Sequence, residues 1–156
     1  MMSETKTRTG QHRVGNIVVS VVRVGSQTTD AWVINEPSDA SRLFLSTAPQ
    51  GDEREHCRIA IIDVRHKVKA LHTVSVGSLT SSLVHPREVF RPAIVAGAAA
   101  IIVSHNHPSG DPEPSPEDIA LTRRLAAAGT LLGIEVLDHI ITGGGRSVSL
   151  RARGVL

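Results

Sequence analysis

The sequence predicts a single α/β domain in which a mixed β-sheet is flanked by helices. Its 156 residues are the length of one domain. Hydrophobic residues make up 40% of the chain and charged residues 21%, which is ordinary globular usage. Segments rich in β-branched residues alternate with segments of helical character, as they do in α/β sandwiches. These observations exclude a wholly disordered chain, a collagen and a coiled coil.

The first fifty residues predict an arm, a strand and a short helix. Residues 1–14 are polar and indicate a flexible basic arm. Residues 15–24 are rich in β-branched side chains and predict a strand. A short helix is expected over 37–47, where apolar residues recur at helical spacing. We therefore expect a strand-helix extension over 15–50, joined to the main domain that follows.

Residues 51–156 predict that main domain, whose elements are more regular. We expect strands at 55–64, 67–76, 99–105, 134–142 and 146–150, and helices at 86–98 and 116–132. Three successive glycines, 143–145, suit the tight turn of a hairpin between the last two strands. Pro92 lies inside the first of the two helices and predicts a kink there.

The composition also predicts a compartment. Cys57 is the one cysteine, so no intramolecular disulfide can form, and this suits a reducing compartment. The longest apolar run, residues 93–103, is far shorter than the roughly 20 residues of a membrane-spanning helix. The polar start of the chain lacks the apolar core of a signal peptide. We therefore expect a cytoplasmic protein without a membrane partner.

The charge distribution and the aromatic content give opposite indications about nucleic-acid binding. The net charge is +2, with basic residues gathered over residues 1–23 and 146–156. Such ends can contact phosphates, or they can simply be solvated. Aromatic residues are only 2% of the chain, so platforms for stacking single-stranded bases are nearly absent.

A polar motif follows the strand expected at 99–105. His105 and His107 are two residues apart, so on an extended chain their side chains point the same way. Imidazole nitrogens bind zinc at roughly 2.0–2.1 Å, and two of them at a strand end supply half of a metal site. Two surface histidines, or two with a structural role, would show the same spacing.

The next helix begins with residues that suit either a cap or a third ligand. Residues 108–114 hold three prolines and a glycine and predict an irregular loop. Ser115, Pro116 and Asp118 then match the N-cap, first and third positions of a helix. If the loop returns beside the strand end, Asp118 adds a carboxylate ligand. Two histidines and one carboxylate leave a fourth position for water, whose pKa zinc lowers to about 7.

From about Glu55 to Leu156 the chain resembles the RadC-like branch of the JAMM/MPN+ (JAB domain) zinc metallohydrolase superfamily. The family pattern is His-x-His, seven residues, Ser, two residues and Asp, and it is matched by His105, His107, Ser115 and Asp118. Further signatures of the branch are VHPRE at 84–88, HNHPSG at 105–110 and the pair Asp138-His139. The resemblance implies a JAB/MPN-type, deaminase-like fold and one Zn²⁺ ion per chain, held by His105, His107 and Asp118.

The resemblance also implies a catalytic glutamate from an early strand, which holds water and moves its proton. Asp52, Glu53 and Glu55 crowd together before the strand expected at 55–64, although a solvated turn would look the same. Aligning the following strand with the family pattern favours Glu55 as this glutamate. Glu53 lies two residues earlier and would point to the same side of an extended chain, so it stays an alternative. Ser115 matches the serine that is implied to donate a hydrogen bond to the developing oxyanion.

Other polar residues are expected to have lesser roles. Asp138 and His139 are neighbours in a strand and face opposite ways, so both cannot face the metal. We expect His139 to lie behind the ligands or in the core. His85 is expected at a helix entry, and Cys57 is expected to be a small buried residue.

Two functions follow as hypotheses. The first is a zinc-dependent hydrolase of the metallopeptidase or isopeptidase type, acting on a peptide or isopeptide substrate. The alternative is a DNA-repair or DNA-transaction accessory protein without catalysis, as the RadC-like label and the basic ends suggest. Longer family members carry an N-terminal helix-hairpin-helix region, which residues 1–50 do not match. A zinc nucleobase deaminase is excluded because its His-x-Glu and Pro-Cys-x-x-Cys signatures are absent.

Overall fold

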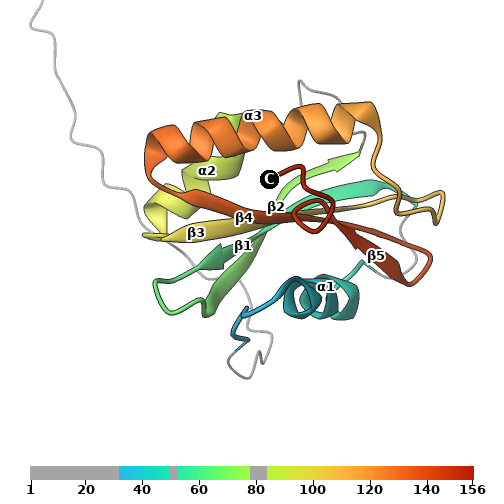
Figure 1. Ribbon diagram of the computed structural model, residues 1–156, viewed down its shortest axis with the longest axis horizontal. Helices are drawn as coiled ribbons and strands as arrows, with labels where there is room; N and C mark the ends of the chain where they lie inside the picture. The colour runs from blue at the N-terminus through green and yellow to red at the C-terminus, as the bar shows by residue number, and fades with distance from the viewer. Residues whose placement is uncertain (1–31, 50–52, 78–83) are drawn as a thin grey trace, which may run out of the picture.

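The computed structural model describes residues 32–49, 53–77 and 84–156, which form a five-stranded mixed sheet flanked by three helices. The elements in chain order are α1 (Pro37–Ser46), β1 (Glu55–Ile62), β2 (Val68–Gly77), α2 (Pro86–Val95), β3 (Ala100–Asn106), α3 (Pro116–Leu132), β4 (Glu135–Gly143) and β5 (Arg146–Ser149). The strand order is β2-β1-β3-β4-β5, and only the β3–β4 pair of this sheet is parallel. Figure 1 shows α2 and α3 on one face and α1 on the other. The predicted α/β fold is confirmed.

The helices and strands predicted after residue 36 are all present, with ends that differ by up to three residues. The largest difference is at α2, which ends at Val95 and is followed by Gly97 at a positive φ of 61°. Pro92 lies inside this helix and does not end it. The arm at 1–14 and the strand at 15–24 lie outside the described residues. In the described part of the chain, no helix is long and apolar enough to cross a membrane.

Each face of the sheet buries its own apolar cluster, because successive strand residues point to opposite sides. In β1, Cys57 and Ile59 belong to the cluster that includes α2 and α3, whereas Ala60 belongs to the cluster under α1. Phe90 and Phe44 are the largest buried side chains of the two clusters. Burying a phenylalanine ring contributes roughly 1.5–3 kcal/mol, so both helix layers hold the sheet firmly.

Arg58 attaches α1 to its face of the sheet. Its guanidinium donates hydrogen bonds to the carbonyl oxygens of Phe44 (3.2 Å) and Thr47 (2.6 Å), at the C-terminal end of α1. It also lies 5.3 Å from the centroid of the Phe44 ring. A cation at this end of a helix satisfies carbonyls that have no partner within the helix. The helix expected within the 15–50 extension therefore packs as part of the domain core.

The carboxyl ends of β3 and β4 lie at the same edge of the sheet, because these two strands are parallel. From the end of β3 the chain turns past the β4–β5 hairpin before it enters α3 (Figure 1). The contact with the hairpin is close: a Cβ added at Gly144 would lie 2.7 Å from the carbonyl oxygen of Gly110. Gly144 and Gly145 have φ values of 56° and 74°, as a tight hairpin turn requires. The glycine run closes the hairpin as predicted, and it also lets the loop pack against the turn.

Candidate metal centre

Three side chains converge where β3 ends: His105 and His107 from the strand end and the residue after it, and Asp118 from the first turn of α3. His105 Nε2 lies 2.9 Å from His107 Nε2 and 3.2 Å from Asp118 Oδ1, and His107 Nε2 lies 3.4 Å from Asp118 Oδ2. Donors bound at roughly 2.0–2.2 Å around a tetrahedral ion are about 3.4 Å apart. The donor set therefore fits one metal ion, and the structure brings together the three residues that the motif singled out.

His107 presents Nε2 to this centre because a carbonyl holds its other ring nitrogen. His107 Nδ1 lies 2.8 Å from the carbonyl oxygen of Asp111. A carbonyl can only accept a hydrogen bond, so Nδ1 carries the ring proton and, in the neutral ring, Nε2 keeps its lone pair. The His107 amide also donates to the carbonyl of Thr142 (2.7 Å), which ties this ligand to β4.

Asp118 caps α3 and faces the histidines at the same time. The amide and the hydroxyl of Ser115 both donate to Asp118 Oδ2, at 2.8 and 2.7 Å, and the Asp118 amide donates back to Ser115 Oγ at 3.1 Å. Oδ1 is left facing His105 Nε2. The capping and ligand interpretations, which the sequence left as alternatives, are thus compatible in one geometry.

The charge state of Asp118 suits metal binding. Burial alone would raise the pKa of this carboxyl group, but the hydrogen bond and charge of His105, together with the hydrogen bonds from Ser115, outweigh burial and hold the pKa well below its usual range. The side chain is only 7% exposed. Asp118 therefore stays ionised at neutral pH, which is the form that binds a cation.

A buried polar chain lies behind His105. Its Nδ1 is 2.8 Å from His139 Nε2, and His139 Nδ1 is 2.6 Å from Thr122 Oγ1. Burial, with the nearby charge of His105, keeps the pKa of His139 well below its usual range, so that ring is neutral. Asp138 points to the other side of β4 and accepts a hydrogen bond from the hydroxyl of Ser149 (2.6 Å). The two neighbours face opposite ways, as expected, and His139 lies behind the ligands.

Glu55 and Glu53 occupy different places relative to the sheet. Glu55 is the first residue of β1 and is half-buried, whereas Glu53 precedes the strand and is exposed. Cys57 pairs with His105 across the antiparallel strands β1 and β3. Continuing that register places Glu55 opposite His107, on the face of the sheet that carries the metal centre.

Asn106 holds the chain on both sides of Glu55. Its Oδ1 accepts a hydrogen bond from the amide of His56 (2.7 Å), and its Nδ2 donates to the carbonyl of Arg54 (2.9 Å). These two bonds take the place of main-chain pairing at the point where β3 ends. The residue between the two candidate histidine ligands therefore also fixes the start of β1.

The comparison with protein families agrees with this geometry. The model of the RadC-like JAB domain matches residues 34–155. The chain belongs to the RadC-like JAB domain family. Similar sequences include UPF0758 proteins of Desulfitobacterium hafniense (52% identical over 124 residues), Moorella thermoacetica (52% over 134) and Caldanaerobacter subterraneus (54% over 121). These alignments cover 80%, 86% and 78% of this chain and 54%, 58% and 52% of the relatives. The chain thus spans about half the length of the curated relatives it matches.

The resemblance based on the motif is therefore confirmed. The sequence pattern assigned no role to two residues that support the candidate site of this RadC-like JAB domain, Thr122 and Asn106. Thr122 lies four residues after Asp118 on α3, and that spacing, which puts two side chains on one face of a helix, could have indicated it. The partners of Asn106 lie some fifty residues earlier in the chain, and no local spacing signals them.

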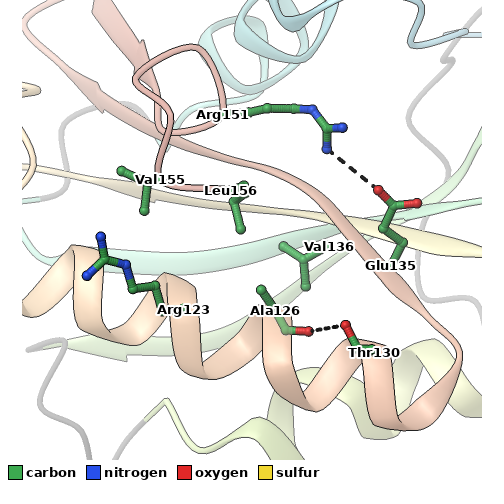
Figure 2. A pocket seen from close by; sticks show the side chains of 8 residues that line it. All are labelled: Arg123, Ala126, Thr130, Glu135, Val136, Arg151, Val155 and Leu156. Carbon is green, nitrogen blue, oxygen red and sulfur yellow. Dashed lines mark hydrogen bonds and ion pairs between the residues drawn. The ribbon is translucent and has the colours of Figure 1, made fainter.

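A separate hollow of about 420 Å³ lies between α3, β4 and the C-terminal segment of this RadC-like JAB domain (Figure 2). It is lined by Arg123, Ala126, Thr130, Glu135, Val136, Arg151, Val155 and Leu156. Arg151 and Glu135 form an ion pair there, with an N–O distance of 3.6 Å. The lining includes none of the three candidate metal ligands, so the hollow is not part of the metal centre.

Proposed function

We propose that this RadC-like JAB domain is a zinc-dependent hydrolase of amide bonds, of the metallopeptidase or isopeptidase type. The observation that carries the proposal is the convergence of two imidazole nitrogens and one carboxylate at the end of β3. This donor set is typical of catalytic zinc sites, which keep a fourth position for water or substrate. A zinc ion held by His105, His107 and Asp118 supplies Lewis acidity, which lowers the pKa of a water molecule to about 7 and polarises a substrate carbonyl.

Glu55 is the proposed general base. It takes a proton from water as the water oxygen bonds to the carbonyl carbon, and it delivers that proton to the leaving nitrogen as the carbon–nitrogen bond breaks. Ser115 is the proposed hydrogen-bond donor to the developing oxyanion. In the structure its hydroxyl donates to Asp118 Oδ2, so this role requires the hydroxyl to turn towards the substrate.

The test compares Glu55→Gln with Glu53→Gln in zinc-loaded protein. Both variants remove one carboxylate, and the two positions share the same parity two residues apart, so each is a matched control for the other. We expect wild type and Glu53→Gln to cleave members of mixed peptide and isopeptide libraries. Glu55→Gln should lose roughly 10²–10⁴-fold in rate while it still binds zinc. A wild-type protein that cleaves nothing, or an unchanged rate in Glu55→Gln, would contradict the proposal.

The alternative function, a DNA-transaction accessory protein, relied on the RadC-like label and on the basic ends of the chain, and the structure describes only the second of these ends. The arginines of residues 146–156 each lie beside a carboxylate: Arg146 by Asp111 (4.0 Å), Arg151 by Glu135 (3.6 Å) and Arg153 by Glu113 (2.5 Å). Paired arginines have less charge available for phosphates, so we place the hydrolase first. DNA binding that falls steeply with rising salt would favour the alternative.

A further inference from the structure

We propose that Thr122 and His139 are positioning residues that fix the ring proton of His105 on Nδ1, so that its Nε2 lone pair faces the metal centre. The proposal deepens the metal-binding part of the function above and rests on it. His107 has a backbone carbonyl for this purpose, whereas the Nδ1 of His105 faces a second histidine, which can either donate or accept. The direction of that hydrogen bond therefore has to be set elsewhere.

The direction is set at Thr122, whose hydroxyl has a single proton. Thr122 Oγ1 lies 2.6 Å from the carbonyl oxygen of Asp118, one helical turn earlier, and a carbonyl can only accept. The hydroxyl proton is therefore directed to Asp118. Only lone pairs of Thr122 Oγ1 remain for His139 Nδ1, which lies 2.6 Å away. His139 Nδ1 must then be the donor of that bond.

The proton on His139 Nδ1 decides the role of the other ring nitrogen. His139 is 0% exposed, and within the part of the chain that the structure describes its ring nitrogens contact a threonine hydroxyl and another imidazole, with no carboxylate oxygen at hydrogen-bond distance. A buried imidazole without a carboxylate partner is neutral, so it has one N–H group. Nε2 therefore accepts, and His105 Nδ1, at 2.8 Å, donates to it.

The chain of hydrogen bonds thus starts at the backbone of one candidate ligand and ends at the ring of another. When Nδ1 holds the ring proton, Nε2 is the nitrogen of His105 that can offer a lone pair to a metal, and this atom lies 2.9 Å from His107 Nε2 and 3.2 Å from Asp118 Oδ1. A chain of the opposite direction would place a proton on that atom, and this proton would have to leave before a metal could bind.

Two substitutions of Thr122 distinguish the effect of its hydroxyl group from the effect of its side-chain shape. Thr122→Val keeps the branched shape but leaves the buried His139 Nδ1–H without an acceptor, so His139 no longer has one preferred ring proton position. We expect zinc binding to weaken roughly 10–100-fold. Thr122→Ser keeps the hydroxyl and should bind zinc within a few-fold of wild type.

Thr130→Val is a matched control on the same helix. The Thr130 hydroxyl makes the same kind of bond to a carbonyl one turn earlier, that of Ala126 (3.1 Å), but it is exposed at the hollow shown in Figure 2. This substitution removes the same chemical group without touching the chain behind His105. Its zinc affinity should equal that of wild type.

The experiment has two readouts. The first is the protonation of ring nitrogens in metal-free wild type, measured by long-range ¹⁵N–¹H correlation on protein with ¹⁵N-labelled histidine. We expect the proton on Nδ1 in both His139 and His105, and a proton on Nε2 of His139 would overturn the proposal. This readout does not depend on whether any variant folds.

The second readout is zinc affinity, measured by competition with a chromophoric chelator for wild type, Thr122→Val, Thr122→Ser and Thr130→Val. A folded Thr122→Val that binds zinc as tightly as wild type, or keeps the His105 proton on Nδ1, would show a merely structural role and overturn the proposal. If Thr122→Val does not fold, Thr122→Ser must keep both its zinc affinity and its ring protons. A wild-type protein that does not bind zinc would instead contradict the proposed function. The ring protons of His139 and His105 would still test the direction of the hydrogen bonds from Thr122 to His105.

Discussion

Asn106 shows how one side chain connects two parts of the candidate site. It lies between the two histidine ligands, yet its amide group contacts the backbone on either side of Glu55. The side chain pairs with main-chain groups as a neighbouring strand would, because it accepts from the amide of His56 in β1 and donates to the carbonyl of Arg54, the residue before β1. The position of the proposed base is therefore coupled to the strand that carries the ligands.

Asn106→Ala is expected to separate catalysis from metal binding. Removing both hydrogen bonds frees the start of β1, and a base displaced by about 1 Å can cost about 10²-fold in rate. The zinc affinity should stay within a few-fold of wild type, because the ligands keep their own partners. Measuring kcat/KM and zinc affinity on the same preparations checks this. Equal losses in both would contradict it, since they would show that Asn106 acts on the ligands.

Cys57 pairs with His105 in the sheet, but it is a packing residue. It is 1% exposed, and burial raises the pKa of its thiol from 9.0 to about 12. At pH 8 the folded protein should therefore react with iodoacetamide roughly 10³-fold more slowly than the unfolded chain, since the thiolate is the nucleophile. Labelling rates with and without urea check this. A folded-state rate equal to that of the unfolded chain would contradict it.

The same pKa predicts how stability depends on pH. The thiol has a higher pKa in the folded protein than in the unfolded chain, so its contribution to the free energy of unfolding is complete below pH 9.0. Between pH 9.0 and about 12 only the unfolded chain releases the proton, and the free energy of unfolding falls as pH rises. Cys57→Ala should lack this part of the pH dependence, which urea titrations at several pH values can measure.

The loop between β3 and α3 has no regular structure, so its shape depends on what it packs against. Gly110 lies against Gly143 and Gly144 of the hairpin turn, and the Arg146 guanidinium donates to the Gly110 carbonyl (3.4 Å). Arg153 pairs with Glu113 at the other end of the loop. The β4–β5 hairpin therefore supports the segment that joins the two candidate histidine ligands to the candidate carboxylate ligand.

Gly144→Ala and Gly145→Ala form a matched pair that measures this support. At Gly145 an added Cβ meets nothing within 4 Å, so only the positive φ is penalised, at about 1–2 kcal/mol. At Gly144 the Cβ also meets the Gly110 carbonyl oxygen, which should cost about 1–3 kcal/mol more. Gly144→Ala should also weaken zinc binding about tenfold, because the loop must shift. Equal stabilities and equal zinc affinities of the two variants would contradict this role of the hairpin.

Elements with local causes could be predicted from the sequence, whereas contacts between distant elements could not. The start of α3 follows from the capping pattern of Ser115 and Asp118, and α3 begins at Pro116 as expected. The common direction of His105 and His107 follows from strand alternation. The glycine run predicts a turn, but nothing local in it indicates that Gly110 will pack there. The hydrogen bond between Thr122 and His139 joins a helix to a strand residue 17 positions later, and no local pattern predicts it. The strand order likewise depends on pairings between segments that are distant in the sequence.

On the scale of the whole molecule, the candidate metal centre lies at one edge of a sheet that is packed on both faces. β3, the residue after it and α3 supply the three candidate ligands, β1 carries the proposed base Glu55, and β4 carries His139, which contacts His105. The apolar clusters on the two faces hold these elements against one another. Every residue of the candidate centre therefore belongs to one packed domain of the RadC-like JAB family, and we expect this domain to bind zinc by itself.

The zinc content of untagged protein, purified without chelators, tests this central claim most directly. His105→Ala removes a ligand, and His72→Ala is the control, because it removes an exposed histidine on β2 away from the centre. We predict about one zinc ion per chain in wild type and in His72→Ala, and a large loss in His105→Ala. Less than about half an equivalent in wild type, or an unchanged content in His105→Ala, would contradict the account.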